Sequence, residues 1–472
     1  MGFDAGSHIA IQAPNCTELV AAELAFYKGA MVKAPLNARL TPDETIHTIN
    51  DSHAVALIAS PAHAEVLSDR RSEMPRLKTI ISIGDGSGDM TYADVISLGQ
   101  DSFNSLNPAD EALAVLHYTS GSSGVLKAAM QSYGNRRALL RKNLIAPRAQ
   151  SKQIHSVVGH VGPITHASGM QILPVTFFGG CNVLFERFDI DNLLATIEKE
   201  GINRLFLVPT MITRVLASGL IGKYDLSSLS SLTYGAAPMP PAVVRQTIEA
   251  FGPIVSQGYG AGETTSTVTV LTADDHIEAL KGDGRRLASC GRSYFECEVM
   301  VLKDDGSEAA PGELGEICVR GPDIMQGYWN APELTAEVLK DGLYHTGDIA
   351  MTDDEGYIFI VDRKKEMIIS GGFNVYPSEV EKVLYTHPSV FEAAVVGVPD
   401  AEWGEAVKAV VVVRKGHDVS EAELLEYCRE GLPGFKRPRS VDFIDELPRN
   451  PNGKIVRRQV RDTYWKTAER MV

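Results

Sequence analysis

The chain lacks the features that mark membrane-spanning and nucleic-acid-binding proteins. Its longest apolar run, about residues 169–181, is interrupted by Pro174 and is well short of the ~20 apolar residues that a membrane-spanning helix needs. Basic residues are too few to dominate the surface, because 45 Lys and Arg against 60 Asp and Glu give a net charge of −15. We therefore expect neither nucleic acid nor an anionic membrane surface as the main partner. An anionic small-molecule substrate would need a local group of positive charges.

Cysteine and histidine are too scattered to indicate a metal site or a disulfide network. The six cysteines form no C-x-x-C pair and the histidines are not clustered, so neither zinc nor disulfides are expected. The first residues contain no basic stretch followed by an apolar one, so we expect no signal peptide. These absences predict a soluble protein of the reducing cytoplasm. The sequence leaves the oligomeric state open, with a homodimer among the alternatives.

The pattern of apolar residues predicts an α/β fold. The 472 residues are enough for roughly three folding units, and a strand expected at 8–12 is followed by a helix that ends at Gly29. Asn15, with Glu18 three residues later, is the expected N-cap of that helix. The alternation recurs in a strand at 53–59, a helix at 61–70, a strand at 77–83 and further elements between 113 and about 235. This order predicts doubly wound parallel sheets, with helices on both faces and ligands at the carboxyl ends of strands.

Two later regions depart from this alternation. Residues 296–320 alternate apolar and polar side chains around turns at 304–306 and 311–313, which predicts a small subdomain of antiparallel strands. Beyond residue 366 the expected elements are strands at 389–397, 406–413 and 440–444 and a helix at 419–430. That mixture indicates a small α+β domain. We predict a large N-terminal domain, residues 1–363, and a small mobile C-terminal domain, residues 364–472.

The most informative stretch is HYTSGSSGVLKAAM, residues 117–130, which follows an apolar strand at 113–116. Its glycines allow backbone N–H groups to point inward, its hydroxyl groups add donors, and its lysine adds a compact positive charge. The residues concerned are Thr119, Ser120, Gly121, Ser122, Ser123, Gly124 and Lys127. Such a loop suits a polyphosphate. A Walker A loop is disfavoured because Lys127 stands three residues after Gly124 and precedes Ala128. Taken alone, the stretch also fits a Ser/Gly-rich surface loop.

This stretch resembles the phosphate-binding signature of the acyl-adenylate-forming superfamily, which includes acyl-CoA synthetases, firefly luciferase and the adenylation domains of nonribosomal peptide synthetases. That signature usually reads Tyr-Thr-Ser-Gly-Thr-Thr-Gly-x-Pro-Lys-Gly. Here Ser122 and Ser123 replace the threonines and keep their hydroxyl groups. Leu126 replaces the proline, and Ala128 replaces the last glycine. The resemblance implies that the loop holds the β- and γ-phosphates of ATP.

Further motifs of the superfamily follow in the same order. His166 matches a position beside the acyl pocket, although taken alone it fits an ordinary half-buried histidine. The turn Gly235-Ala236-Ala237 matches the backbone on which adenine lies, and taken alone fits a strand-end turn. The run Gly258-Tyr259-Gly260-Ala261-Gly262-Glu263 matches the motif whose tyrosine stacks on adenine and whose glutamate helps to hold Mg²⁺. Gly262 replaces the usual threonine, so we expect a weaker or water-mediated contact near the α-phosphate.

The second half of the chain carries the remaining matches. The segment ending in Asp348 resembles the Thr-Gly-Asp motif, whose acceptor-only carboxylate receives both ribose hydroxyl groups. Residues 357–379 match the inter-domain junction nearly residue for residue. That match implies that Arg363 contacts ribose and phosphate, that Lys365 is the hinge, and that the Gly371-Gly372 loop faces the CoA tunnel.

The resemblance also assigns a catalytic lysine and a CoA-binding group. Lys454, at the end of Pro451-Asn452-Gly453-Lys454, corresponds to the lysine that bridges the carboxylate and the α-phosphate. Residues at the positions where aryl-CoA ligases contact CoA are Trp403, Phe435, Arg437 and Arg439. The basic tract 435–439 also fits a solvated charge run.

Together these resemblances imply an ATP-dependent carboxylate-CoA ligase that forms acyl-AMP and pyrophosphate, then acyl-CoA and AMP. Carboxylate attack on the α-phosphate builds up negative charge, which positioned cations and N–H dipoles must stabilise. The expected catalytic residues are Lys454, Glu263 with Mg²⁺, and His166. ATP and a carboxylic acid are the substrates, and coenzyme A is the co-substrate. Two alternatives stay open: a stand-alone adenylation enzyme that loads a carrier protein, and an inactive ATP-binding homologue.

The expected acyl-pocket segments offer no lysine or arginine to a substrate. Residues 161–176, 234–238 and 259–267 contain no arginine or lysine, so a second substrate carboxylate would lack a partner. We therefore predict an apolar monocarboxylate, aromatic, alicyclic or medium-chain. Residues 1–50 match the first strand and helix of the superfamily's nucleotide domain, so the N-terminal domain is expected to lack a preceding segment.

Overall fold

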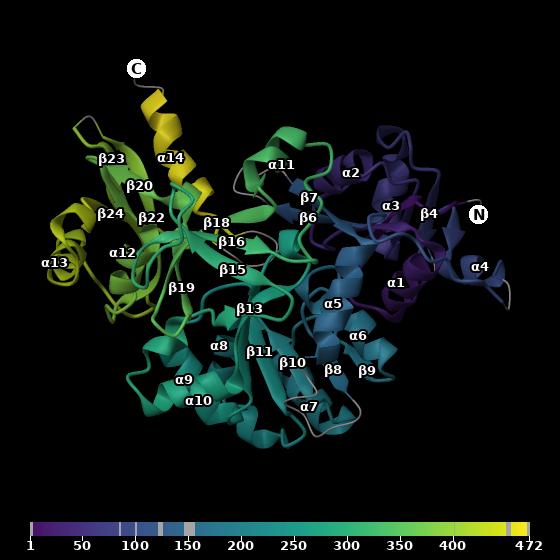
Figure 1. Cartoon of the computed structure of the whole chain (residues 1–472), viewed down its shortest axis with the longest axis horizontal. Coiled ribbons are helices and arrows are strands. Elements are labelled where there is room, and N and C mark those ends of the chain that lie inside the picture. Colours follow the sequence, from purple (N-terminus) through teal and green to yellow (C-terminus); the bar gives the residue numbers. More distant parts are fainter. Residues whose placement is uncertain are drawn as a thin grey trace. The chain divides into compact units, whose positions relative to one another are not determined.

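The computed structural model describes residues 3–84, 86–99, 102–120, 126–145, 156–400, 402–449 and 455–469, without the side chains of residues 120 and 466–469. Figure 1 follows the chain from its N-terminus to its C-terminus. The chain forms two compact units, one of Met1–Val299 with Val319–His345 and one of Met300–Cys318 with Thr346–Val472. The boundary expected between residues 363 and 364 falls inside the second unit and stays a prediction. Among the described residues, no helix combines the length and the apolar character that crossing a membrane requires.

The first unit begins with a seven-stranded sheet in the order β5-β4-β3-β1-β2-β6-β7. Its strands are β1 (His8–Gln12), β2 (Val32–Pro35), β3 (Ala56–Ala59), β4 (Thr79–Ser82), β5 (Met90–Thr91), β6 (Leu113–Ser120) and β7 (Leu126–Ser132). The helices of this region are α1 (Thr17–Gly29), α2 (Pro42–Asp51), α3 (Pro61–Asp69), α4 (Tyr92–Ser97) and α5 (Tyr133–Ile145), with the 3₁₀ turn η1 (Arg71–Glu73). All neighbouring strands are parallel except β6 and β7, which form an antiparallel hairpin.

Both faces of this sheet are buried, as the doubly wound fold requires. Successive residues of β1 point to opposite faces. Ile9 and Ile11 join one apolar cluster with Leu19 and Phe26 of α1, whereas Ala10 joins the other with Leu67 of α3. The predicted α/β alternation is therefore confirmed for this part of the chain.

The expected N-cap of α1 is wrong. Cys16 is the N-cap residue and makes no side-chain cap hydrogen bond. The Asn15 side chain instead donates to the backbone carbonyls of His160, Gly162 and Phe185 at 2.9–3.2 Å. It also accepts the backbone N–H of Ile164 at 2.8 Å. Asn15 thus joins distant segments, because its amide offers both donors and an acceptor.

A second seven-stranded sheet completes the first unit, in the order β14-β13-β12-β11-β10-β8-β9. Its strands are β8 (Val157–His160), β9 (Cys181–Leu184), β10 (Arg204–Leu207), β11 (Ser231–Gly235), β12 (Val255–Gly260), β13 (Thr267–Leu271) and β14 (Arg292–Ser293). The helices are α6 (Ile172–Phe177), α7 (Ile190–Glu200), α8 (Pro209–Ala217), α9 (Pro241–Phe251) and α10 (Ala273–Lys281), with η3 (Ala167–Gln171), η4 (Ile221–Lys223), η5 (Gly262–Thr264) and η6 (Arg285–Ala288). Strands β8 to β12 are parallel, and β13 and β14 run antiparallel to their neighbours.

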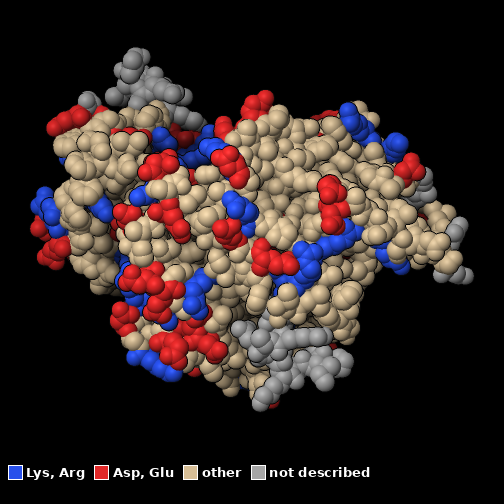
Figure 2. Space-filling view, viewed as in Figure 1, with Lys and Arg blue, Asp and Glu red and all other residues tan. Residues whose placement is uncertain are grey.

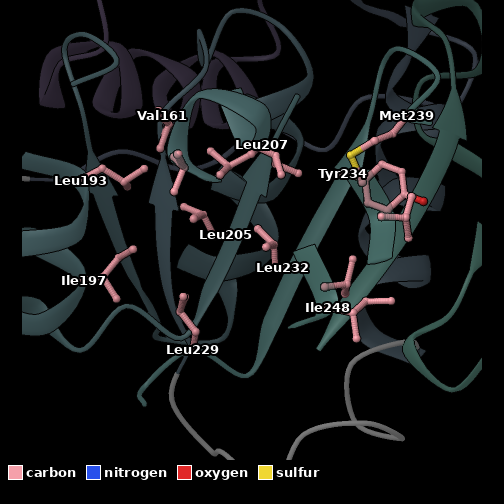
Figure 3. Packing of buried hydrophobic residues seen from close by; sticks show 14 of the residues in the cluster. Val161, Leu193, Ile197, Leu205, Leu207, Leu229, Leu232, Tyr234, Met239 and Ile248 are labelled. Carbon is pink, nitrogen blue, oxygen red and sulfur yellow. The ribbon is translucent and has the colours of Figure 1, made fainter. Parts of the chain in front are cut away.

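The largest apolar cluster covers one face of this second sheet (Figure 3). Alternate residues Leu205 and Leu207 of β10 point into it, as do Leu232 and Tyr234 of β11. Ile197 and its neighbours in α7 pack against them. This core holds the carboxyl ends of β11 and β12 side by side, where two of the predicted site motifs begin.

A smaller sheet follows, in the order β15-β16-β18-β17, with β19 also paired to β18. Its strands are β15 (Glu298–Leu302), β16 (Gly315–Arg320), β17 (Leu339–Lys340), β18 (Leu343–Thr352) and β19 (Ile358–Arg363), and α11 (Pro332–Val338) precedes β17. Strand β18 is antiparallel to β17 and β19. The small β subdomain predicted from the alternation of residues 296–320 is present.

The last sheet belongs to the second unit and has the order β21-β20-β23-β22, with β24 parallel to β23. Its elements are β20 (Ile368–Ser370), β21 (Phe373–Val375), β22 (Val390–Asp400), β23 (Gly404–Val413), β24 (Ser440–Phe443), α12 (Pro377–Leu384), α13 (Glu421–Gly431), α14 (Arg457–Glu469), η7 (Lys364–Glu366) and η8 (Gly434–Lys436). Alternate residues of β22 and β23 enter two clusters, one with α12 and α13 and one with α14. The predicted small α+β region is confirmed.

The charges of the surface are mixed. Figure 2 shows acidic and basic side chains interspersed on the face in view, as expected for a chain in which acidic residues outnumber basic ones.

Candidate active site

The described residues of the phosphate-loop motif lie on the two strands of the hairpin formed by β6 and β7. The sequence predicts a loop from residue 118 to 130, but β6 continues to Ser120 and β7 starts at Leu126. Thr119 is paired with Lys127 across the hairpin, and Ser120 with Leu126. Strand pairing therefore fixes the motif residues on both sides of the undescribed segment 121–125.

Three of the predicted site residues meet around Tyr328. The Glu263 carboxylate oxygen Oε1 accepts the Tyr328 hydroxyl at 2.8 Å and the Thr119 hydroxyl at 3.4 Å. The Lys127 ammonium lies 5.8 Å from the centre of the Tyr328 ring. Tyr328 is buried, with 8% of its surface exposed, so this arrangement is held in place by packing. The hairpin and η5 thus place a cation, a carboxylate and a hydroxyl group together.

The backbone around Glu263 is fixed from two sides. Gln131 of β7 donates its side-chain amide to the Gly262 carbonyl at 2.8 Å, and the Met325 backbone N–H donates to the Glu263 carbonyl at 2.8 Å. Arg136 donates to the Gln131 side-chain oxygen at 3.3 Å. This chain of bonds leads from α5 through β7 to the turn that carries the carboxylate.

The space beside Gly262 is filled by a side chain of β6. A Cβ atom at Gly262 would lie 2.4 Å from Cδ2 and 3.1 Å from Nε2 of His117, and 2.8 Å from Cγ2 of Thr119. A threonine at position 262 would therefore overlap the His117 imidazole in its present position. Gly262 leaves room for that ring, in addition to removing a hydroxyl group.

His117 and His166 lie close to each other at this site. Their ring centres are 5.8 Å apart in an edge-to-face arrangement, and His166 Nδ1 is 3.0 Å from the Thr165 hydroxyl oxygen. Burial lowers the pKa of His166 to about 4. Burial, with smaller effects from His166, Lys33 and Arg136, lowers the pKa of His117 to about 3. Both imidazoles are therefore neutral near pH 7.

A buried ionic cluster lies close enough to influence His117. Glu23 forms an ion pair with Lys33, and its other oxygen lies 3.6 Å from Arg136. Arg136 also donates to the Tyr27 hydroxyl at 2.6 Å. Although burial opposes it, the charges of Lys33 and Arg136 lower the pKa of Glu23. Two cations against one carboxylate leave a positive surplus, which favours an anion nearby.

The predicted adenine-binding residues come together at adjacent strand ends. Gly235 at the end of β11 is paired with Gly258 of β12, and a Cβ atom at Gly235 would lie 2.4 Å from the Gly258 carbonyl oxygen. Ala236 has a left-handed backbone conformation, with φ 66°. Tyr259 follows Gly258 on β12, and the same segment continues into Gly262 and Glu263. The residues predicted to bind adenine are therefore joined, within one short segment, to the Glu263 carboxylate.

In the second unit, Asp348 and Arg363 are direct neighbours. They face each other across β18 and β19, and Arg363 Nε lies 2.5 Å from Asp348 Oδ1. Asp348 is 6% exposed, and its backbone N–H donates to the Thr346 hydroxyl at 3.0 Å. Lys365 follows in η7, between β19 and β20. The two residues that the sequence assigns to ribose therefore form one ion pair.

The predicted CoA-binding residues separate into two groups. Gly371 lies against Trp403, since a Cβ atom there would be 2.3 Å from the indole ring, and Arg439 stacks 4.3 Å above the same ring. Gly372 precedes Phe373, whose ring lies 4.9 Å from that of Phe435.

Arg437 is held elsewhere. Its guanidinium donates to the carbonyls of Leu432 at 2.8 Å and Arg429 at 3.0 Å, at the end of α13. That placement makes the Arg437 side chain a cap for the last turn of the helix.

Comparison with known protein families identifies the chain. The AMP-binding enzyme family matches residues 1–329, and the AMP-binding enzyme C-terminal domain matches residues 379–454. The chain belongs to the AMP-binding enzyme family. The superfamily resemblance drawn from the motifs is thereby confirmed.

Related AMP-binding enzymes match nearly the whole chain. A feruloyl-CoA synthase from an Amycolatopsis species is 37% identical over 465 residues, covering 98% of this chain and 90% of the relative. A long-chain-fatty-acid-CoA ligase from Escherichia coli O157:H7 is 33% identical over 500 residues, covering 98% and 86%. The crystal structure of ATP-bound MatB from Rhodopseudomonas palustris has a TM-score of 0.88 at 31% identity, covering 98% of this chain and 90% of MatB. The predicted fold class is confirmed by this structural similarity.

Several predicted site residues of this AMP-binding enzyme cannot be placed. Gly121, Ser122, Ser123, Gly124 and Lys454 lie outside the described residues, as does the side chain of Ser120. Their roles stay predictions.

Other residues of the site were missed by the sequence analysis. Tyr328, Gln131 and Arg136 belong to none of the motifs. Tyr328 bonds Glu263, which is 65 residues away in the sequence, and Gln131 bonds Gly262, which is 131 residues away. Arg136 bonds Gln131, only five residues away. His117 directly precedes the Tyr-Thr-Ser-Gly part of the motif. Because residues two apart on a strand point to the same face, its position two residues before Thr119 could have indicated that both side chains face the site.

Proposed function

We propose that this chain is an ATP-dependent carboxylate-CoA ligase that proceeds through an acyl-adenylate. The observation that carries the proposal is the meeting of Thr119, Lys127 and Glu263 around the Tyr328 side chain. The family, and relatives named as CoA ligases over nearly the whole chain, support the same reaction.

The first half-reaction joins two anions, so charge must be balanced at the phosphates. Lys127 supplies a cation at the base of the hairpin loop, and the Thr119 hydroxyl lies beside it on the facing strand. Fixed cations and donors of this kind stabilise the charge that develops when a carboxylate oxygen attacks phosphorus and pyrophosphate leaves. Lys454 is proposed to bridge the carboxylate and the α-phosphate.

Glu263 is suited to hold Mg²⁺ with the phosphates of ATP. Mg²⁺ in phosphate-transfer sites is commonly bound by one or two carboxylates together with substrate phosphates. No cluster of three or more possible protein ligands occurs among the described residues, so a single carboxylate fits this pattern. When bound there, Mg²⁺ would neutralise charge on the leaving pyrophosphate.

The second half-reaction transfers the acyl group to the thiol of CoA. The turn between β20 and β21, with Gly371, Gly372, Trp403 and Arg439 around it, is the proposed contact surface for CoA. Phe435 belongs to this surface through its contact with Phe373. Arg437 contributes through the helix end that it caps rather than through a free guanidinium.

The proposed acid is an apolar monocarboxylate, aromatic, alicyclic or medium-chain. The segments 161–176, 234–238 and 259–267 offer no cation to a second carboxylate. His166 lies among them and is uncharged near pH 7 because burial lowers its pKa. An aromatic acid and a fatty acid in the names of two relatives support this class.

The test is product analysis of the purified full chain with ATP, Mg²⁺, CoA and a panel of acids. Benzoate, cinnamate, cyclohexanecarboxylate and octanoate are expected to include substrates that give acyl-CoA and AMP. Comparable turnover of malonate would contradict the proposed acid class. Adenylate formed without consumption of CoA would instead indicate a carrier-loading enzyme, and no product with any acid would indicate an inactive homologue.

A further inference from the structure

The His117 imidazole takes the place that a side chain at position 262 would need. The absent Cβ atom would lie only 2.4 Å from Cδ2 of that ring, and 3.1 Å from Nε2. A threonine hydroxyl oxygen is one bond beyond its Cβ atom, so Nε2, 3.1 Å from that Cβ position, stands close to where such an oxygen would reach. His117 of β6 thus places a nitrogen where the side chain of a residue larger than glycine at position 262 of η5 would lie.

Neither nitrogen of the His117 ring is bonded to a described residue, so a ligand can be its partner. Across the described part of the chain, no residue forms a hydrogen bond with the His117 ring, although a neutral imidazole has one donor and one acceptor. The ring is half-buried rather than sealed. By contrast, His160 on β8 bonds Ser168 and Asn182 with its two nitrogens, as a structural histidine does.

The surroundings of His117 favour an anion. The His166 ring, at the predicted acyl pocket, is 5.8 Å from the His117 ring, and the turn that carries Glu263 also lies against His117. Behind it, Lys33 and Arg136 outnumber Glu23 by one charge. His117 therefore lies near both the predicted acyl pocket and the turn that carries Glu263, in a field that attracts negative oxygen.

We infer that His117 is a further catalytic residue for adenylation, donating an imidazole N–H to an anionic oxygen where the carboxylate meets the α-phosphate. The inference rests on the proposed function and deepens it. It also explains Gly262, since the glycine makes room for the imidazole that replaces the usual hydroxyl donor.

The experiment measures the two half-reactions separately, by pyrophosphate release with acid and ATP, and by acyl-CoA formation from synthetic acyl-adenylate. We expect His117→Ala to lower kcat for pyrophosphate release on the order of 10²-fold, as removal of one preorganised donor does. Acyl-CoA formation from supplied adenylate should change much less. His117→Gln, which keeps an N–H donor, should recover part of the loss, whereas His117→Leu, which keeps only bulk, should not.

A double substitution tests the exchange of the two side chains. Gly262→Thr alone should impair adenylation through overlap with His117. His117→Ala/Gly262→Thr should be faster than either single variant, because the closest overlap is then removed and the Thr119 methyl, 2.8 Å from the added Cβ atom, can rotate away. Replacement of the exposed His417 by Ala is the matched control and should leave the rate unchanged. Melting temperatures identify any variant that fails to fold.

The outcomes separate this inference from the proposed function. If the unaltered chain releases no pyrophosphate with any acid, the proposed function fails. If the chain is active but His117→Leu equals it, or the double variant is no faster than both single variants, His117 only fills space and the inference is overturned.

Discussion

Glu263 receives both of its hydroxyl donors on one carboxylate oxygen. Tyr328 and Thr119 both bind Oε1, and no hydrogen bond to Oε2 is found among the described residues. Two donors on the same oxygen orient the carboxylate and leave the second oxygen available for a cation. Glu263 is therefore oriented by one residue of the phosphate-loop motif, Thr119, and by one residue outside the motifs, Tyr328.

Lys127 should matter for ATP far more than for CoA. We expect Lys127→Ala to raise the ATP concentration needed for half-maximal rate and to slow adenylation, because a positive charge at the phosphate loop is lost. Acyl-CoA formation from supplied adenylate should be much less affected. Steady-state kinetics of both half-reactions measure this.

The control for that substitution is Lys199→Ala, because the Lys199 side chain is 80% exposed and pairs only with its neighbour Glu200 among the described residues. Equal damage to both half-reactions by Lys127→Ala would indicate misfolding and contradict the assigned role.

At the residue scale, the sequence predicted members of contiguous motifs and missed their supports. Glu263 and Lys127 stand inside recognisable runs, so their types and spacing were sufficient. Tyr328 and Gln131 reach them from other segments of the chain, and only the fold brings these segments together. Asn15 was misassigned for the same reason, since its long-range backbone partners outweigh a local cap.

At the element scale, the hairpin of β6 and β7 shows where composition misleads. Ser, Gly and Thr are typical of loops, and the sequence therefore predicted a loop over most of 118–130. The two strands are nevertheless paired from Leu113 with Ser132 to Ser120 with Leu126, and this pairing keeps both strands extended. The apolar strands of the last sheet were predicted within a few residues, because their valine-rich runs are buried on both faces.

Helix α14 is attached to α12 by a buried ion pair. Arg457 donates from Nε to Glu381 Oε1 at 2.8 Å and from Nη2 to Oε2 at 2.6 Å, and it also contacts Glu366. Glu381 is 7% exposed and additionally accepts the Val395 N–H at 2.8 Å. This bidentate contact and its neighbours connect α14, α12, η7 and β22 of the second unit.

We expect Arg457→Met to destabilise the second unit by about 3–5 kcal/mol, because it leaves the Glu381 carboxylate buried without its cation. Adding Glu381→Gln should recover much of that loss, since glutamine removes the charge but keeps an oxygen for Val395. Differential scanning calorimetry of the full chain measures both. Arg429→Met, at a side chain that is 61% exposed, is the control. A double variant no more stable than Arg457→Met would contradict the explanation.

For the molecule as a whole, the half-buried histidines His117 and His166 make stability depend on pH. The pKa of His117 lies near about 3 and that of His166 near about 4 when folded, against 6.5 in an unfolded chain. Between pH 6.5 and about 4 the unfolded chain therefore binds protons that the folded chain does not. The stability that the two neutral imidazoles contribute is complete above pH 6.5 and is lost as the pH falls from 6.5 to about 4.

We expect the free energy of unfolding at pH 5 to be lower than at pH 7.5 by about 2 kcal/mol for each of these two histidines. Urea unfolding at the two pH values measures it. His166→Asn should reduce the difference in unfolding free energy between the two pH values by about 2 kcal/mol, the part that His166 contributes. Replacement of the exposed His417 should leave that difference unchanged. A stability that is the same at both pH values would show that neither imidazole is kept neutral by folding.

The two half-reactions should respond differently to Lys454 and Gly372. Lys454→Ala should lower adenylate formation by ~10²–10³, as loss of a charge-stabilising donor does, and spare acyl-CoA formation from supplied adenylate. Gly372→Leu should do the reverse. Gly372 has φ 82°, and a Cβ atom there meets no other atom within 4 Å, so an added side chain points into open space.

Because leucine also strains a left-handed backbone, Gly372→Asn is the control for conformation, since asparagine tolerates this region. Pyrophosphate release and acyl-CoA formation measure the two steps. If Lys454→Ala and Gly372→Leu depress both steps equally, one mobile domain does not serve the two half-reactions in turn.

The second unit is built from two separate stretches of chain, Met300–Cys318 and Thr346–Val472. Strands β15 and β16 therefore leave the ribosome before their partners β18 and β19. At ~5–20 residues per second, synthesis of the intervening residues 319–345 takes roughly 1–5 s, during which these strands have no complete sheet. The first unit also contains Val319–His345, so its folding cannot be completed until these residues have been synthesised. Nascent chains stalled before and after residue 363 should thus differ sharply in resistance to protease, and synonymous codons that slow this interval should lower the yield of folded protein.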